Sequence, residues 1–293
     1  MTRRLLRVLP AVLLLGGAFL LGRFLILSPG DRAARIDGPV TGIVWQVDDA
    51  TAKPEGEWQR LGADHLLIQW ILVDGIGFAR GTGGKAPTQM PDWRRIAKEP
   101  WARHVTLGLA GDFDEKKARE NALQLARTSA AIAGKKPPLA VEGYYFPVEV
   151  DPTWKEAAEV MPKALALLPR PLWISVYDNS NIGGEALADW LSTWLPADVG
   201  VFFQDGAGVA ARSPQTARDY ADALSARLGK DRLRVIAEAF RPLPQGGFRP
   251  ATVQELMPQI ALMEGYALYL FDGPHYLDDT LVDALVKRID ERD

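Results

Sequence analysis

Two glutamates follow apolar stretches of this sequence, where an unpaired acid is costly to bury. Glu149 lies in the stretch GYYFPVEVDPTW, from Gly143 to Trp154, and Glu238 follows the apolar residues Val235–Ala237. Two carboxyl groups that flank a glycosidic bond can break it, because one protonates the leaving oxygen and the other attacks the anomeric carbon or activates water. We therefore take Glu149 as a candidate general acid/base and Glu238 as a candidate nucleophile or base.

Glu149 and Glu238 could each have a structural role instead. Asp151 is placed to cap a helix that we expect to start near Thr153, and Glu149 could belong to the same turn. Glu238 could form an ion pair at the end of its strand with Arg241. At the level of the sequence these alternatives stay open.

Polar and aromatic side chains gather near the ends of the other apolar runs. A carbohydrate presents apolar C–H faces and many hydroxyl groups, so aromatic rings together with amide and carboxylate groups suit it. The candidate ligand-binding residues are Trp45, Gln46, Gln69, Trp70, Tyr145, Tyr177, Gln204 and Asp205. For any single aromatic residue, packing in the core is the alternative. The glycines after Asp205 could likewise serve a turn rather than a ligand.

Composition argues against several classes of function. The chain contains no Cys, which excludes disulfides, thiolate metal sites and Cys nucleophiles, and its net charge of −3 gives no basic field for nucleic acid. The three histidines, His65, His104 and His275, are scattered without metal-binding spacing, so we expect no metal and no cofactor. The segment 206–211 formally fits a loose dinucleotide-binding pattern, but Asp205 beside it would repel a pyrophosphate.

Alternating strands and helices must position these residues. Short apolar runs alternate with amphipathic stretches, which is typical of βα units around a parallel sheet. The 254 residues from Val40 to Asp293 match the length, about 250 residues, of a single (β/α)8 TIM barrel. The eight predicted strands are 41–47, 65–73, 104–109, 143–147, 172–176, 199–203, 233–237 and 267–271. In such a barrel the site is built where the strands end.

Two prolines bear on the expected limits of the strands and helices. Pro147 has no backbone N–H for a sheet ladder, so the fourth strand should end close to it. Pro162 should kink or split the helix that follows. The other predicted helices cover 57–61, 114–133, 214–228 and the segment from Asp279 onward, and a long glycine-rich loop covers 74–91. A doubly wound open sheet is the main alternative fold.

The N-terminus has the pattern of a secretory or anchoring segment. Three arginines precede an apolar run, and no clear small-residue cleavage site follows it. We predict a signal anchor or signal peptide over residues 1–27, a linker over 28–39 and the (β/α)8 barrel over 40–293. Positive charge before the run predicts that the barrel faces the periplasm, held by the inner membrane, or is periplasmic if the segment is cleaved. The sequence gives no indication of oligomeric state.

Several blocks of the sequence resemble an uncharacterised family of bacterial glycosidase-like TIM barrels, known as a domain of unknown function. The blocks are Trp45-Gln46, Leu61–Asp64, Leu67–Trp70, Gly143–Trp154, Phe203–Gly208 and Val235–Phe240. The resemblance covers most of 40–242 and implies that Glu149, Asp205 and Glu238 occupy site positions. Glycosidases of the largest barrel clan usually have Asn before the strand-four Glu, and Val148 departs from that pattern.

Two functions are therefore expected. The first is a glycoside hydrolase that acts on a bacterial poly- or oligosaccharide at the cell envelope. The second is a non-catalytic glycan-binding barrel that assists the synthesis or export of exopolysaccharide.

Overall fold

The computed structural model describes residues 38–292. The predicted signal anchor or signal peptide, residues 1–27, lies outside the described residues, as does most of the predicted linker. Within residues 38–292, the helices are all too short or too polar to cross a membrane.

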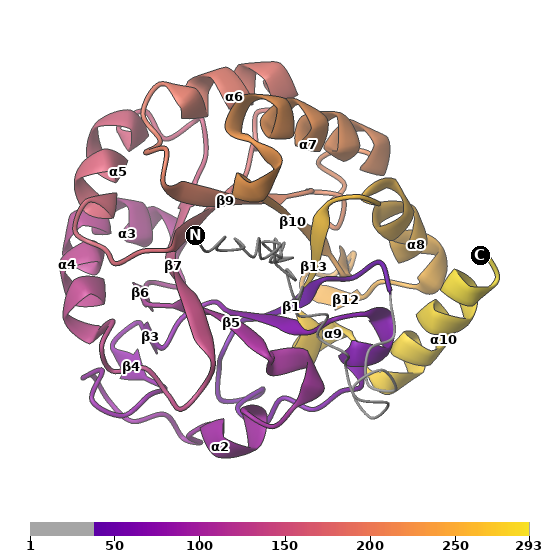
Figure 1. The fold of residues 1–293 in the computed structure, drawn as a ribbon, viewed down its shortest axis with the longest axis horizontal. Helices are drawn as coiled ribbons and strands as arrows, with labels where there is room; N and C mark the ends of the chain where they lie inside the picture. The colour runs from indigo at the N-terminus through magenta and orange to yellow at the C-terminus, as the bar shows by residue number, and fades with distance from the viewer. Residues whose placement is uncertain (1–37, 293) are drawn as a thin grey trace, which may run out of the picture. The chain divides into compact units, whose positions relative to one another are not determined.

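Eight parallel strands close into a barrel (Figure 1). They are β1 (Gly42–Trp45), β2 (His65–Ile68), β5 (His104–Gly108), β7 (Val141–Val150), β8 (Leu172–Val176), β9 (Val199–Gln204), β10 (Leu233–Glu238) and β13 (Ala267–Phe271). Around the barrel they follow chain order, and β13 pairs with β1 to close the ring. The predicted (β/α)8 barrel is confirmed, and each of the eight predicted strands overlaps one strand of the barrel.

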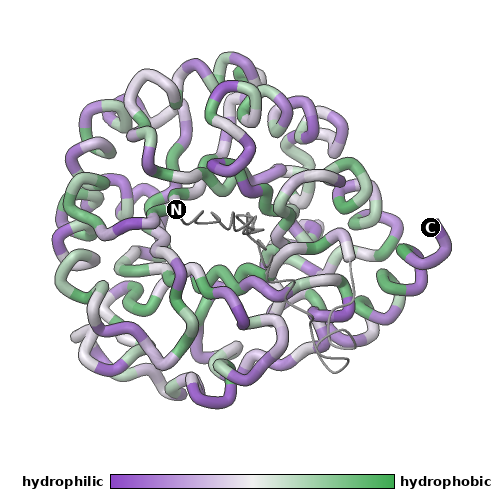
Figure 2. Tube along the Cα trace, in the orientation of Figure 1, coloured by the Kyte–Doolittle hydropathy of each residue, from purple (hydrophilic) through white to green (hydrophobic). Residues whose placement is uncertain are grey.

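The barrel encloses a packed interior rather than a pore. Its central apolar side chains are Val44, Leu67, Tyr145, Phe202, Ile236 and Tyr269, and all six are buried. A second and larger apolar cluster joins the strands to the helices. In Figure 2 the hydrophobic parts of the chain concentrate in the central strands, and hydrophilic parts lie toward the periphery. Strands buried on both faces explain the near-continuous apolar runs of the sequence.

Helices surround the barrel (Figure 1). They are α2 (Trp93–Ile96), α3 (Glu115–Glu120), α4 (Ala122–Ile132), α5 (Ala157–Leu165), α6 (Gly184–Ser192), α7 (Pro214–Leu228), α8 (Val253–Leu262), α9 (Gly273–Tyr276) and α10 (Asp279–Asp290). Helix α7 has its predicted limits because the Ser213 side chain accepts the backbone N–H of Thr216 and Pro214 takes the first helical position. The predicted helix 114–133 is divided into α3 and α4 at Asn121.

Strand β7 does not end near Pro147 as expected. It continues to Val150, and its pairing with β8 shifts register between Phe146 and Val150. A local irregularity of this kind accommodates a residue that cannot donate to the ladder. The extra length carries Glu149 on the strand itself, and α5 begins at Ala157 instead of Thr153.

Two small sheets and three 3-10 turns complete the described part of the chain. Strands β3 (Leu72–Val73), β4 (Ile76–Gly77) and β6 (Ala110–Gly111) form one sheet, and β11 (Phe240–Pro242) pairs with β12 (Phe248–Pro250). The 3-10 turns are η1 (Trp58–Leu61), η2 (Pro100–Ala102) and η3 (Lys230–Arg232). Part of the predicted long loop 74–91 therefore has strand structure. Pro162 lies inside α5 without splitting it.

Candidate active site

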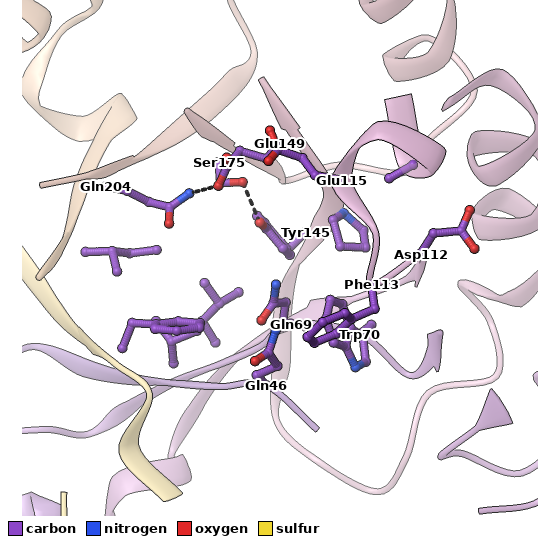
Figure 3. A pocket seen from close by; sticks show the side chains of 16 residues that line it. Gln46, Gln69, Trp70, Asp112, Phe113, Glu115, Tyr145, Glu149, Ser175 and Gln204 are labelled. Carbon is purple, nitrogen blue, oxygen red and sulfur yellow. Dashed lines mark hydrogen bonds between the residues drawn. The ribbon is translucent and has the colours of Figure 1, made fainter. Parts of the chain in front are cut away.

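A cavity of about 220 Å³ opens where the barrel strands end (Figure 3). Its walls are formed by Val44, Gln46, Leu67, Gln69, Trp70, Asp112, Phe113, Glu115, Ala118, Tyr145, Pro147, Glu149, Ser175, Gln204, Ile236 and Phe271. Clefts for drug-sized ligands usually enclose about 300–1,000 Å³. This cavity is thus suited to a small ring rather than to a long ligand held along its whole length.

Glu149 is the acid that faces this cavity from the barrel wall. Its side chain accepts a hydrogen bond from the amide of Gln204, which ends β9 (Figure 3). Burial raises the pKa of Glu149 to about 7, the Gln204 bond acts against that rise, and Glu238 adds a smaller repulsion. Arg119 donates to the backbone oxygen of Glu149 across 3.1 Å and so holds the strand at this point.

Amide and aromatic groups cover other parts of the wall. Gln46 and Gln69 are half-buried, and within the described residues the Oε1 atom of Gln69 has no hydrogen-bond partner. Tyr145 is buried and donates its hydroxyl to Ser175 across 2.7 Å. Trp70 donates its indole N–H to a backbone oxygen and so presents only its apolar ring. A ligand with hydroxyl groups could satisfy the free amide oxygen.

Phe113 is a wall residue that the sequence did not single out. It lies just after β6, its exposed fraction is 68%, and its ring meets Trp70 edge to face at 6.2 Å between centroids. An exposed aromatic ring beside a cavity is an apolar surface for a ligand. The only sequence signal is that Asp112 and Phe113 follow a strand end, which applies to many residues that line no cavity.

Glu238 is placed differently from Glu149, because it is not among the residues that line the cavity. Its Oε2 atom accepts the backbone N–H of Val209 at 3.2 Å, and the backbone of Gly208 also bonds to the carboxylate. A Cβ atom at Gly208 would come within 2.4 Å of Glu238, so only glycine allows this close approach. Burial, and then repulsion from Asp205, raise the pKa of Glu238 to about 7.

The expected ion pair between Glu238 and Arg241 is not formed through the carboxylate. Arg241 donates instead to the backbone oxygens of Glu238 and Phe240 and to the side chain of Gln259. Glu238 therefore remains an acid held by backbone N–H groups, without a salt bridge among residues 38–292.

Tyr177 follows β8 and lies within the field of both glutamates. It is buried, and the Arg212 guanidinium lies 5.2 Å from the centre of its ring. Burial first, and then the charge of Glu238, raise its pKa, with smaller effects from Glu149 and Asp205. Its hydroxyl is thus a neutral group beside the two acids at any ordinary pH.

Asp205 is fully buried and bound on both oxygens. Its Oδ1 atom accepts the backbone N–H groups of Ala207 and Glu238, and Oδ2 accepts the amide of Gln259 at 2.7 Å. Burial raises its pKa, and these hydrogen bonds oppose the rise. The carboxylate ties β9, β10 and α8 together and does not line the cavity.

Trp45 is also fully buried and away from the cavity wall. Its indole donates to Thr51, and its ring packs 5.6 Å from that of Trp93. The structure thus brings Gln46, Gln69, Trp70, Tyr145, Glu149 and Gln204 together on one wall. Among the predicted site residues, Trp45, Tyr177, Asp205 and Glu238 lie off that wall.

A histidine stands near the same end of the barrel but not on the cavity wall. His275 lies between two carboxylates, with Nδ1 3.0 Å from Asp272 and Nε2 3.1 Å from Asp48. Both ring nitrogens are therefore occupied. Asp272 raises the pKa of His275, because a carboxylate beside the ring stabilises its protonated, cationic form.

Comparison with known proteins gives a fold and no family. No model of a known protein family matches the sequence, and no curated protein matches it either. The resemblance to an uncharacterised barrel family thus stays a prediction.

Among solved structures, this chain is similar to a candidate alpha-L-fucosidase from Bacteroides thetaiotaomicron, with 16% identity, a TM-score of 0.56 and coverage of 96% of this chain and 98% of that one. It is also similar to a GH18 chitinase from Pseudoalteromonas aurantia, with 10% identity, a TM-score of 0.51 and coverage of 86% and 99%. A third is the PgaB glycoside hydrolase domain from Bordetella bronchiseptica, with 13% identity, a TM-score of 0.50 and coverage of 85% and 99%. At these identities the shared feature is the barrel fold, which this chain has in common with proteins described as glycosidases.

Proposed function

We propose that this protein is a glycoside hydrolase that acts on a poly- or oligosaccharide of the bacterial cell envelope. The observation that supports this most directly is the position of Glu149. Its side chain faces a cavity lined by amide and aromatic side chains, and burial raises its pKa to about 7. A general acid works best when its pKa lies near the operating pH. The names of the structurally similar chitinase and glycoside hydrolase domain support a sugar as the ligand.

In this proposal the two glutamates divide the chemistry. Glu149 is protonated in the resting enzyme and gives its proton to the leaving oxygen, while the Gln204 amide fixes its orientation. Glu238 supplies the second carboxylate, as nucleophile or as base. Burial raises the pKa of each acid to about 7, so both titrate near neutral pH. Gln46 and Gln69 bind hydroxyl groups.

A non-catalytic glycan-binding barrel is the second candidate. The observation that favours it is the position of Glu238, which lies under the backbone of Gly208 and Val209 and off the cavity wall. Val148, where the largest barrel clan usually has Asn, points the same way. Such a protein would bind a polysaccharide during its synthesis or export without cutting it.

The variants Glu149→Gln and Glu238→Gln test the enzyme. Reducing ends released from a panel of bacterial polysaccharides should fall by about 100-fold or more in each, because each loses an acid–base or nucleophilic group. Glu185→Gln is the matched control, since Glu185 is exposed on α6 away from the cavity, and it should keep the wild-type rate.

The expected stability of the Glu149→Gln variant separates a loss of catalysis from a loss of folding. The pKa of Glu149 is raised on folding, so its contribution to stability is present below about pH 4.5 and is lost as the pH rises through about 7. Glu149→Gln should therefore be at least as stable as the wild type at pH 8, and lost turnover would not reflect unfolding.

The outcomes separate the two candidates. Turnover that survives both substitutions would rule out the two-glutamate mechanism. Saturable binding of a polysaccharide with no reducing ends released over long incubation would establish the binding protein instead. If no glycan binds, both proposals fail.

A further inference from the structure

The opposite end of the barrel brings together two histidines that are far apart in the sequence. His65 begins β2 and His104 begins β5, and the two residues are direct neighbours in the parallel register of these strands. Their imidazole rings stack, with centroids 4.6 Å apart and planes at 29°. The expectation that the histidines are scattered is thus wrong for this pair.

Carboxylates hold both rings. The Oδ1 atom of Asp64 lies 2.6 Å from Nδ1 of His65, and the Oε1 atom of Glu142 lies 2.6 Å from Nδ1 of His104. The second oxygen of Asp64 lies 4.0 Å from Nε2 of His104. No group within residues 38–292 forms a hydrogen bond with Nε2 of either ring. For His65, the Asp64 carboxylate on one ring nitrogen, with the other nitrogen free, is the arrangement found in histidine ligands of metal ions. Glu142 has to leave Nδ1 of His104 to become a metal ligand itself.

Three side chains converge closely enough to share one ion. Donor atoms from His65, His104 and Glu142 all lie within 4.8 Å of one another. Ligands about 2.0–2.1 Å from a tetrahedral Zn²⁺ ion lie about 3.3 Å apart, so the set must close by an ångström or so. The Glu142 side chain is 58% exposed and His104 is 40% exposed, which leaves both free to make that adjustment and leaves the site open to solvent.

We propose that His65, His104 and Glu142 bind a divalent transition-metal ion of the Zn²⁺ class, with Asp64 orienting His65 or completing the ligand set. This inference is independent of the proposed glycosidase activity, since the site lies at the amino-terminal ends of the strands. Two imidazoles select zinc, copper or nickel over magnesium and calcium, which prefer oxygen ligands.

The local charge is compatible with a cation. Asp64 and Glu142 each carry a negative charge, and the positive charge of Arg234, on β10, also acts on His65 although β10 does not pair with β2. Arg234 is occupied otherwise, because its guanidinium lies 3.8 Å from the centre of the Trp173 ring and donates to Thr106. With neutral imidazoles, the two carboxylates and Arg234 sum to a net charge of about −1, which a divalent ion converts to +1.

The site would join three adjacent strands of the barrel. His65, His104 and Glu142 belong to β2, β5 and β7, which are neighbours in the sheet. In barrels of this type the amino-terminal ends of the strands contribute stability, whereas the opposite ends carry chemistry. The bound ion should therefore stabilise the fold without being required for activity.

Zinc titration of the untagged full chain tests this proposal. After removal of metal with a chelator, calorimetry should show one Zn²⁺ bound per chain, with a rise in Tm of roughly 5 °C at saturation. His104→Gln and Glu142→Gln should each weaken Zn²⁺ binding by about 10-fold or more. His275→Gln, the matched control at the other end of the barrel, should bind Zn²⁺ as the wild type does.

Several results would overturn the proposal. They are a wild-type chain that takes up no stoichiometric Zn²⁺, a His104→Gln chain that binds as tightly as the wild type, and an equal Tm shift with Mg²⁺. The Tm of each variant without metal shows whether it has folded. Because both substituted side chains are exposed, we expect these Tm values to stay near that of the metal-free wild type.

Discussion

Four aspartates at the carboxyl ends of the barrel strands build loops, and Glu149 serves the cavity instead. Four aspartates are fully buried and each accepts a backbone N–H from a loop: Asp151 from Asn179, Asp178 from Ile182, Asp205 from Ala207 and Asp272 from Gln46. A short acid reaches the backbone nearby and builds turns. Glu149 and the glutamines have one more carbon and extend to the cavity, whereas Glu238, of the same length, accepts backbone N–H groups as the aspartates do.

The hydrogen bond from Gln204 should control the pH profile of the proposed enzyme. The amide stabilises the ionised form of Glu149, so it lowers a pKa that burial raises to about 7. Gln204→Leu removes the donor and should raise that pKa further. The alkaline limb of kcat/KM, where Glu149 loses its proton, should then move to higher pH by roughly one unit.

A surface glutamine provides the control for this shift. Gln215→Leu on α7 removes an exposed amide that, within residues 38–292, donates to Asp219 alone, and its pH profile should match the wild type. An alkaline limb that stays in place in Gln204→Leu, or moves to lower pH, would show that Glu149 is not the group titrating there.

The exposed ring of Phe113 should contribute to ligand binding. Phe113→Ala removes an apolar surface at the cavity and should raise the KM or Kd for a glycan about fivefold, which corresponds to about 1 kcal/mol. Phe248→Ala is the matched control, because Phe248 is 49% exposed on β12 and does not line the cavity. Equal effects of the two substitutions on Kd, measured by calorimetry, would remove Phe113 from the site.

At the scale of elements, one buried network sets the position of Glu238. Gln259 on α8 donates to Asp205 across 2.7 Å and accepts from Arg241, and Asp205 in turn accepts the backbone N–H of Glu238. The network joins the ends of β9 and β10 to the helix outside them. Glu238 is thus positioned in part by α8, a helix that contributes no residue to the cavity wall.

Gln259→Leu should break that network. It leaves Asp205 and Arg241 each without one partner in a buried environment, so we expect a loss of about 1–3 kcal/mol in unfolding free energy. The acid limb of the pH profile, which reports ionisation of Glu238, should also shift. Gln254→Leu, an exposed position on the same helix, should change neither the urea midpoint nor the profile. A midpoint loss with an unchanged pH profile would assign Gln259 to stability alone.

The sequence predicted the barrel well because strand signals are local. Apolar runs and their spacing placed all eight strands, whereas β7 was cut short since the effect of Pro147 depends on its pairing with β8. Side-chain direction was harder to predict. A shift of one residue along a strand turns a side chain to the other face. Trp45 thus points to the core and Gln46 to the cavity, and sequence composition alone does not separate them.

At the scale of the whole molecule, the two ends of the barrel differ in chemistry. The carboxyl ends of the strands carry a cavity with a half-buried acid, and the amino ends carry the stacked histidines with their carboxylates. Changes at one end should therefore leave the other largely unaffected. This separation is what allows zinc binding and glycan binding to be measured as independent properties.

The N-terminal segment should decide where these properties are used. We propose that residues 1–27, with three arginines before an apolar run, hold the barrel at the inner membrane facing the periplasm. The full chain should then sediment with membranes and resist carbonate extraction, whereas a chain that starts at Gly38 should stay in the supernatant. Both should act on a soluble oligosaccharide at the same rate, because the closed barrel lies within residues 38–292. Carbonate release of the intact chain would contradict anchoring. A mature mass that lacks about the first 30 residues would identify a cleaved signal peptide and a periplasmic protein instead.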